Sequence, residues 1–203
     1  CSYNLCGTLT YRFSSSENAF GSGANLQNLP SEKSKVNVKV AKRGTGLSVP
    51  NVRAMFIPDP GYTFFDMDLE RADLQVVAWE ADDADFKQIL REGADIHAEN
   101  AKTLNIDREL SKTWTHGTNY GGTPPTMAKQ CGILVHQATQ MQKRWFDAHP
   151  GIKRWHERTK HYLDTRKYVE NAWGYRWYVF GRPERLLPEA LAWVPQSTVA
   201  ILI

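Results

Sequence analysis

The feature that most constrains the fold is a run of helix-type segments in the middle of the chain. From residue 82 to residue 165, apolar residues recur at helical spacing, and glycine or proline interrupts them at short intervals. Because helices commonly end at such residues, the pattern predicts consecutive short helices joined by tight turns. The predicted helices span roughly residues 82–91, 95–103, 107–120, 124–131, 136–147 and 151–167.

Strand-type sequences flank this helical region. Residues 62–68 are aromatic and β-prone, and they lead into a helical pattern over residues 70–81. Residues 168–180 predict a hairpin, and a final helix is predicted to begin near Glu189 or Pro195. A helical middle with a few strands at either end predicts an α+β fold. The helix over 70–81 places its apolar residues on one face: Leu74, Val77, Ala78 and Ala81.

The first fifty residues are rich in turn formers. Residues 14–16, 21–23 and 25–30 are predicted to form loops. Residues 31–48 carry five basic side chains, which suit either a solvated loop or a segment that binds an anionic partner.

The composition excludes several classes of protein. A hydrophobic fraction of 41% and a charged fraction of 23% are values of a globular chain. Three cysteines exclude a disulfide scaffold and fit a reducing compartment, and no apolar stretch approaches the ~20 residues of a membrane span. The net charge of +3 is too small to indicate nucleic acid by itself. Because the sequence begins at Cys1 and stops at Ile203 within an apolar run, we expect a fragment.

A cluster of carboxylates marks the place where the predicted strand becomes a helix. It comprises Asp66, Asp68, Glu70 and Asp73, and the spacing of two puts Asp66 and Asp68 on one face of the strand. Such hard oxygen donors suit Mg²⁺ or Mn²⁺. The alternative is that these acids only favour the positive end of the following helix.

A stripe of four side chains follows the predicted helix over 107–120. Arg108, Lys112, His116 and Tyr120 are spaced by four residues, so each step turns about 40° around the helix. Two cations are followed by two rings, which would suit a triphosphate and then a sugar or base. Asp107 is positioned to cap the helix. The alternative is a solvent-facing helix with an aromatic anchor.

A polar loop near the N-terminus is a weaker signal. Asn25, Gln27 and Asn28 follow Arg12, and amide side chains of this kind contact phosphate and minor-groove acceptors. Ordinary turn chemistry accounts for the same residues.

Taken in this order, these patterns resemble family A DNA polymerases of the bacterial polymerase I and phage type. Residues 12–15 and 25–30 are similar to the family segments Arg-Leu-Ser-Ser and Asn-Leu-Gln-Asn-Ile-Pro, and residues 68–75 resemble motif A. Residues 108–121 resemble motif B, with the pattern Arg-x3-Lys-x3-Phe/Tyr-Gly-x2-Tyr-Gly. Residues 95–97 match the tripeptide Asp-Ile-His.

The resemblance implies a division of the chain into subdomains. Residues 1–75 would form the N-terminal part of a palm, with antiparallel strands and motif A. Residues 76–184 would form mostly helical fingers, with the motif B helix at 107–121 and the hairpin at 168–180. Residues 185–203 would be the start of a palm helix.

The resemblance also implies roles for individual residues. Asp68 would be a catalytic carboxylate that ligates two Mg²⁺ ions, with Mn²⁺ as a substitute, and Lys112 would assist the leaving pyrophosphate. The implied nucleotide-binding residues are Arg108, Lys112, His116, Tyr120, Asp73 and His97. The implied DNA-binding residues are Arg12, Asn25, Gln27, Asn28 and Gln196.

The implied activity is template-directed DNA synthesis by two-metal nucleotidyl transfer from a dNTP to a primer 3′-hydroxyl. The implied partners are primer–template DNA and dNTP, with no membrane, in the cytoplasm of a bacterial or phage-infected cell. The family's His-Asp-Glu motif C is not in the sequence, so the rest of a polymerase chain, with its thumb and motif C, is an expected partner.

Two substitutions depart from the family pattern. Asp73 stands in place of a Glu that excludes a 2′-hydroxyl, and His116 stands in place of Phe or Tyr. Titration of His116 near pH 6.5 would make nucleotide binding depend on pH. The alternative function is a catalytically incomplete module that binds nucleic acid or nucleotide. A relative of single-subunit RNA polymerases is disfavoured by the acid at position 73.

Overall fold

The structure is a computed structural model that describes residues 2–4, 7–16, 20, 52–65 and 67–202. The chain divides into two compact units, Cys1–Glu70 and Arg71–Ile203. Helices predominate and two small antiparallel sheets accompany them, so the predicted α+β class is confirmed. The assignment of residues 1–75, 76–184 and 185–203 to palm, fingers and a palm helix stays a prediction.

The first unit contains one short antiparallel pair. Strand β1 (Ser2–Asn4) pairs with β2 (Ser14–Ser16), with Ser2 opposite Ser16. The prediction of a loop at residues 14–16 is therefore wrong. Ladder bonds use backbone groups, which serine supplies as well as any other residue. The predicted loops at 21–23 and 25–30 lie outside the described residues.

The predicted strand over residues 62–68 is also absent from the described part of this segment. Residues 62–65 and 67–69 form no strand, and a 3-10 turn, η2 (Val52–Met55), precedes them. Phe64 and Phe65 are 64% and 85% exposed. A strand needs a neighbour with which to pair, and the strands that the structure describes pair β1 with β2 and β3 with β4.

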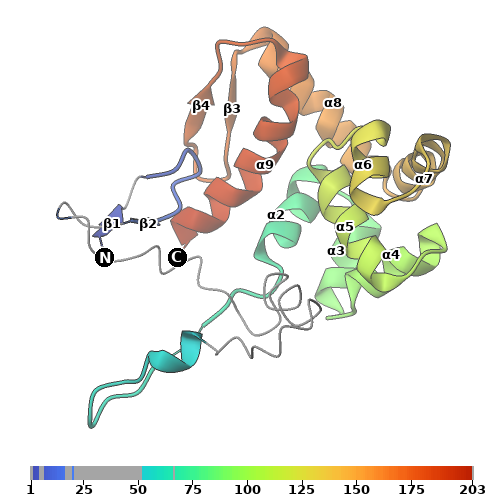
Figure 1. Cartoon of the computed structure of the whole chain (residues 1–203). Coiled ribbons are helices and arrows are strands. Elements are labelled where there is room, and N and C mark those ends of the chain that lie inside the picture. The colour runs from blue at the N-terminus through green and yellow to red at the C-terminus, as the bar shows by residue number, and fades with distance from the viewer. Residues whose placement is uncertain (1, 5–6, 17–19, 21–51, 66, 203) are drawn as a thin grey trace. The chain divides into compact units, whose positions relative to one another are not determined.

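The second unit is a helical array with one hairpin (Figure 1). Its helices begin and end within a few residues of the predicted positions up to residue 167. They are α2 (Ala72–Ala81), α3 (Ala84–Arg91), α4 (Ile96–Leu104), α5 (Arg108–Asn119), α6 (Pro124–Cys131), α7 (Val135–Ala148), α8 (Pro150–Thr165) and α9 (Pro183–Leu202). Across the residues that the structure describes, no helix combines the length and apolarity needed to cross a membrane.

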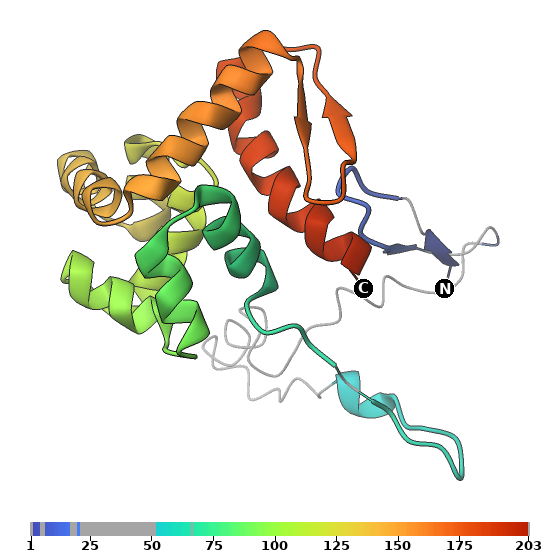
Figure 2. The same cartoon turned by 180° about the vertical axis from the view of Figure 1, so that it is seen from behind.

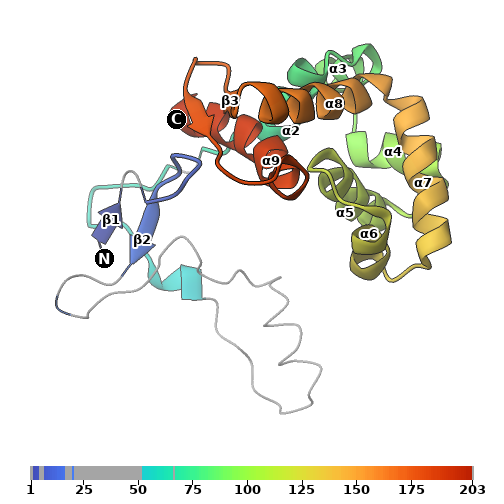
Figure 3. The same ribbon diagram turned by 90° about the horizontal axis from the view of Figure 1, so that it is seen from above.

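These helices pack in two groups around a continuous core. Helices α4, α5, α6 and α7 pack on one another, while α2, α8 and α9 form the second group, visible from behind in Figure 2 and from above in Figure 3. Trp145 and Trp155, the sequence's candidate core residues, are 0% and 1% exposed. The predicted apolar face of α2 is confirmed, because all four of its residues are buried: Leu74, Val77, Ala78 and Ala81.

The last helix begins earlier than the sequence predicts. Helix α9 starts at Pro183 and continues through Pro188 and Pro195, which had suggested a later start. A proline inside a helix costs about 3 kcal/mol through its missing hydrogen bond and steric clash. Burial of Leu191 and Trp193 against the neighbouring helices offsets that cost.

The predicted hairpin at 168–180 is confirmed. Strand β3 (Tyr168–Glu170) pairs antiparallel with β4 (Arg176–Tyr178), and Tyr168 lies opposite Tyr178. The Asn171 amide oxygen accepts backbone bonds from residues 173 and 175, which shapes the turn. The Asn171 amide nitrogen donates to Ser197 Oγ on α9, so the hairpin is fixed to that helix.

A buried carboxylate joins three elements of the second unit. Asp83 caps α3 by accepting a bond from the Phe86 amide, and it accepts a second bond from the Gly151 amide at the start of α8. His149 Nδ1 lies 3.6 Å from the same carboxylate, and both side chains are at most 5% exposed. A Cβ on Gly151 would lie 2.7 Å from the Ala81 carbonyl oxygen, so only glycine permits this approach.

The lowered pKa of one histidine on α8 predicts how the free energy of unfolding depends on pH. His156 Nε2 bonds to the Asn119 carbonyl oxygen, and burial lowers the pKa of His156 from 6.5 to about 4. The unfolded chain therefore binds a proton more readily, so the stabilisation is complete above pH 6.5 and falls as pH decreases toward 4. We expect the loss to reach about 3 kcal/mol in urea unfolding at graded pH.

The control for this expectation is on the same helix. His156→Gln is expected to flatten the profile between pH 6.5 and 4, whereas His161→Gln, which changes an exposed histidine, leaves its slope unchanged. If the free energy of unfolding had the same slope against pH in the His156 variant and the parent chain, the pH dependence could not be assigned to His156.

Candidate functional site

Helix α5 carries the predicted stripe on its outer side. Asp107 caps the helix as predicted, with its carboxylate accepting a bond of 2.9 Å from the Leu110 amide. Elsewhere around its circumference the helix buries Ser111, Trp114, Thr115 and Thr118. The stripe itself grades from the exposed Arg108 and Lys112 to the half-buried His116 and Tyr120.

The ring end of the stripe meets α2. The Tyr120 hydroxyl donates to Asp73 Oδ2 over 3.5 Å, although the two residues lie 47 positions apart. Asp73 is in the first turn of α2 and is half-buried. Folding therefore brings the carboxylate at the start of α2 against the aromatic residue that follows α5.

Two histidines pack side by side in the middle of the stripe. The ring centroids of His116 and His97 are 5.5 Å apart, and His97 is 8% exposed. Burial, followed by the charge of Lys112, lowers the pKa of His116, and the Asp73 carboxylate partly opposes this. Burial, followed by the charge of His116, lowers the pKa of His97. Both rings are therefore mainly neutral at pH 7, and titration of His116 lies below the expected pH 6.5.

The cation end of the stripe meets α4. Arg108 Nε donates to Asp95 Oδ2 over 2.6 Å, and Asp95 caps α4 through the His97 and Ala98 amides. The hydrogen bond from Arg108 lowers the pKa of Asp95, which keeps this carboxylate ionised. The sequence missed this ion pair, although an acid as the first residue of the helix predicted over 95–103 could have identified Asp95 as a cap.

The start of α2 is tied to the turn before α4. Arg71 precedes α2 with a left-handed backbone, φ 54°, and its guanidinium donates to the Ala94 carbonyl oxygen. Asp73 and Asp95 are thus held by elements that contact each other directly. Within the described chain, His97 Nδ1 is buried without a hydrogen-bond partner, which leaves a polar atom for a ligand beside the stripe.

The remaining predicted site residues belong to other segments of the chain. Asp68 is exposed and belongs to the first unit, as does the exposed Arg12. Gln196 lies half-buried on α9, next to the buried Ser197. Three further predicted DNA-binding residues fall outside the described residues: Asn25, Gln27 and Asn28. The described residues contain no group of three or more potential metal ligands among His, Cys, Asp and Glu.

The cluster therefore combines an Arg, a Lys, an imidazole and a phenol of the stripe with a second imidazole from α4 and a carboxylate from α2. The chain belongs to the DNA polymerase family A, whose sequence profile matches residues 1–185. The matched residues include the whole of α5 and its neighbours α2 and α4.

Curated relatives agree with this assignment. The chain is 31% identical to a thermostable DNA polymerase I of Thermus filiformis over 186 residues, which cover 87% of the chain and 20% of that protein. It is 32% identical over 143 residues to DNA polymerase I of Deinococcus radiodurans, covering 66% of the chain and 15% of that protein. A DNA polymerase of Mycobacterium phage D29 is 29% identical over 133 residues, covering 62% of the chain and 22% of that protein. The chain spans about a fifth of the length of these relatives.

A solved structure confirms the fold. The polymerase domain of Pol1 from M. smegmatis, determined with DNA primer–template and dNTP, matches with a TM-score of 0.75. The match covers 98% of this chain and 35% of that one at 20% identity.

Proposed function

We propose that the chain takes part in template-directed DNA synthesis, in which a nucleotidyl group passes from a dNTP to a primer 3′-hydroxyl. Family membership supports DNA synthesis in general. The observation that carries the finer proposal is the α5 stripe, whose ring end meets Asp73 and whose middle packs on His97. The order of cations and then rings matches the order of phosphates, sugar and base in a nucleotide.

In this proposal the stripe binds the nucleotide along its length. Lys112, which is exposed, and Arg108 hold the triphosphate, and Lys112 supplies positive charge as the pyrophosphate leaves. The neutral rings of His116 and His97 pack against the sugar and the adjoining phosphate. Asp73 accepts a hydrogen bond from the Tyr120 hydroxyl. A nucleotide 2′-hydroxyl beside Asp73 would compete with this bond. Catalysis then consists mainly of positioning and charge stabilisation.

In this proposal Asp68 binds the divalent metal ion. Mg²⁺ commonly binds through one or two carboxylates together with water and substrate phosphates, so one exposed carboxylate fits the expected donor chemistry. When bound, the ion would neutralise charge on the triphosphate and lower the pKa of the attacking hydroxyl. The use of two ions, with Mn²⁺ as a substitute, belongs to the same proposal.

The residues proposed to contact primer–template DNA are Arg12 and Gln196, together with three residues outside the described part of the chain: Asn25, Gln27 and Asn28. The M. smegmatis polymerase domain has the same fold and was solved in complex with primer–template and dNTP, which supports the proposal of these ligands. The alternative is a module that binds nucleotide or nucleic acid without completing the reaction. Extension of a primer by this chain would decide against that alternative.

The proposed function predicts a template-dependent complex. The chain with Mg²⁺ and a primer–template is expected to retain the complementary dNTP better than a mismatched dNTP, measured with labelled nucleotides by equilibrium filtration. The physical reason is that only a paired base can stack and place its triphosphate along the cations. Equal retention of all four nucleotides would contradict template-directed synthesis.

The proposed metal ligand can be tested by changing Asp68 and, as a control, a second exposed aspartate of the same unit. Asp68→Asn keeps the size of the side chain but removes its charge, so we expect at least a tenfold higher Mg²⁺ concentration for half-maximal retention of the dNTP. Asp59→Asn changes another exposed carboxylate of the same unit and is expected to leave the Mg²⁺ requirement unchanged. Similar shifts in both variants would contradict a specific role for Asp68.

A further inference from the structure

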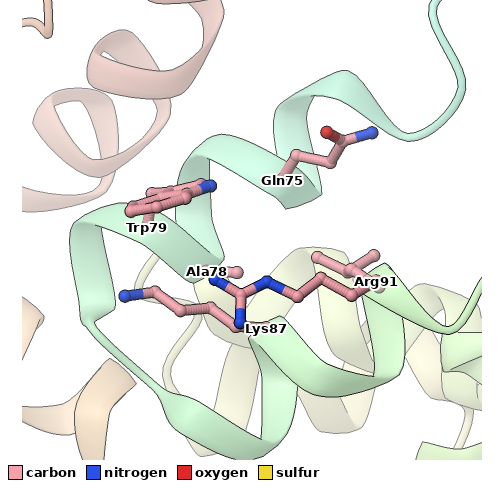
Figure 4. Close-up of a pocket in the computed structure, with 6 residues that line it drawn as sticks. Gln75, Ala78, Trp79, Lys87 and Arg91 are labelled. Atoms are coloured by element: carbon pink, nitrogen blue, oxygen red, sulfur yellow. The ribbon is translucent and has the colours of Figure 1, made fainter.

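A cleft lies on helices α2 and α3 and does not include any residue of the stripe. It has a volume of about 130 Å³ and is lined by Gln75, Ala78, Trp79, Lys87, Leu90 and Arg91 (Figure 4). Trp79 follows Asp73 by six residues, which moves it about 9 Å along α2 and turns it about 120° around the axis. The cleft therefore faces a different direction from the Asp73 carboxylate.

The aromatic wall of the cleft is an exposed tryptophan. Trp79 is 66% exposed and Trp173 is 51% exposed, whereas Trp114, Trp145, Trp155 and Trp193 are at most 1% exposed. A single exposed apolar side chain needs no explanation. Trp79, however, stands beside a cation, because Lys87 Nζ lies 4.6 Å from the centroid of its ring.

The opposite wall supplies two cations one helical turn apart. Lys87 and Arg91 both reach from α3 toward the side of α2 that carries Trp79 (Figure 4). The Lys87 ammonium also forms an ion pair with the exposed carboxylate of Asp82. Arg91 is exposed, and within the described residues it has no carboxylate partner. Two like charges at this spacing repel, so an anion placed between them would relieve the repulsion.

We propose that this cleft binds single-stranded nucleic acid, with one base stacked on Trp79 and the adjoining phosphates against Lys87 and Arg91. An exposed aromatic ring beside cations is the combination that binds single strands without sequence preference. The Gln75 amide at the rim adds a polar group that can bond to a base edge.

An acidic peptide is the competing occupant. Glutamate side chains would form ion pairs with Lys87 and Arg91 equally well, but they cannot stack on the exposed ring of Trp79. The tryptophan is therefore the observation that favours a nucleic acid. The inference rests on the proposed function only in that a chain of this family works on DNA.

The test measures binding of a fluorescein-labelled dodecathymidylate to the 203-residue chain by fluorescence anisotropy at several salt concentrations. Trp79→Ala is expected to weaken binding about tenfold, and Trp79→Phe is expected to retain most of the affinity because phenylalanine can still stack. Arg91→Gln is expected to lower the slope of log affinity against log salt by about 0.7, the value for one phosphate contact to a single strand. Arg144→Gln on α7 is the matched control and should leave the affinity and the slope unchanged.

A second measurement locates the contact directly. A dodecamer with one 5-iodouracil is irradiated in complex with the chain, and the cross-linked peptide is identified by mass spectrometry. A cross-link at Trp79 that is lost in the presence of unlabelled oligonucleotide supports the proposal. Unchanged affinity in Trp79→Ala, together with cross-links only elsewhere, overturns it. Tighter binding of a decaglutamate peptide that depends on Arg91 overturns it in favour of a protein partner.

Failure of the cleft proposal can be distinguished from failure of the proposed function. Lys112→Ala removes a charge from the stripe, not from this cleft, so it should keep the Trp79 cross-link while it loses dNTP. A chain that binds dNTP through the stripe but shows no effect of Trp79→Ala overturns the cleft alone.

Discussion

Replacing Lys112 by alanine is expected to weaken dNTP binding about 10- to 100-fold. A charge-assisted hydrogen bond contributes about 1.5–3 kcal/mol, and Lys112 is the exposed cation next to the two imidazoles. Titration with a fluorescent dNTP measures the affinity. Lys112→Arg keeps the charge and is expected to recover part of the binding, because its planar fork holds a phosphate differently from a point charge.

The matched control is Lys129→Ala, which removes an exposed lysine from α6. We expect it to leave dNTP binding within about twofold of the parent chain. The Lys112 change has a second readout, because Lys112 lowers the pKa of His116. In Lys112→Ala the pKa of His116, followed by NMR, should rise. Equal losses of dNTP affinity in the two lysine variants would contradict the stripe as a nucleotide site.

Replacing Asp83 by alanine is expected to be the more damaging of two changes at helix caps. The change removes the cap of α3 and leaves the buried Phe86 and Gly151 amides without their acceptor. The lost cap bond from the Phe86 amide costs about 1 kcal/mol and the unsatisfied Gly151 amide costs about 1–3 kcal/mol, so we expect a total of about 2–4 kcal/mol. Urea unfolding at pH 7 measures the difference.

Asp107→Ala provides the comparison, since Asp107 caps α5 through one bond at an exposed position. Its expected cost is about 1 kcal/mol. Asp83→Asn keeps an acceptor for the α3 cap but changes the contact with His149, and its cost should fall between the two alanine variants. A similar cost for both alanine changes would show that burial adds nothing to the Asp83 cap.

Sequence periodicity predicted the second unit well because its helices obey local rules. Glycine, proline and capping acids mark their ends, as with Asp107 before α5 and Gly132 after α6. The apolar face of α2 followed from the spacing of Leu74, Val77 and Ala78 in the same way. Such signals lie within a few residues of the structure that they specify, so no tertiary information is needed to read them.

The errors arose where pairing or packing overrides local preference. The serines at residues 14–16 form a strand because a second backbone segment pairs with them, and serine composition contains no signal of this. Residues 62–65 have β-type composition, yet no described strand lies beside them. Helix α9 passes through Pro188 because burial of the residues that follow outweighs the local cost.

The sequence predicted which residues of the candidate site share one helix, but it did not predict their contacts with residues of other helices. The spacing of the stripe identified Lys112, His116 and Tyr120 as neighbours on one helix. The bond from Tyr120 to Asp73 and the packing of His116 on His97 connect segments that are distant in sequence, and no periodicity reports them. The lowered pKa of His116 likewise depends on burial that appears only in the folded chain.

The acidic partners of two cations have a consequence for the choice of anion. Arg108 is already paired with Asp95, and Lys87 with Asp82. An anion that binds Arg108 or Lys87 must displace a tethered carboxylate, which is present at high effective concentration. Chloride, acetate or a single carboxylate gains little from that exchange, whereas a polyphosphate delivers several charges at once. Cations that are already paired in this way discriminate between ligands by the number of charges that each ligand carries.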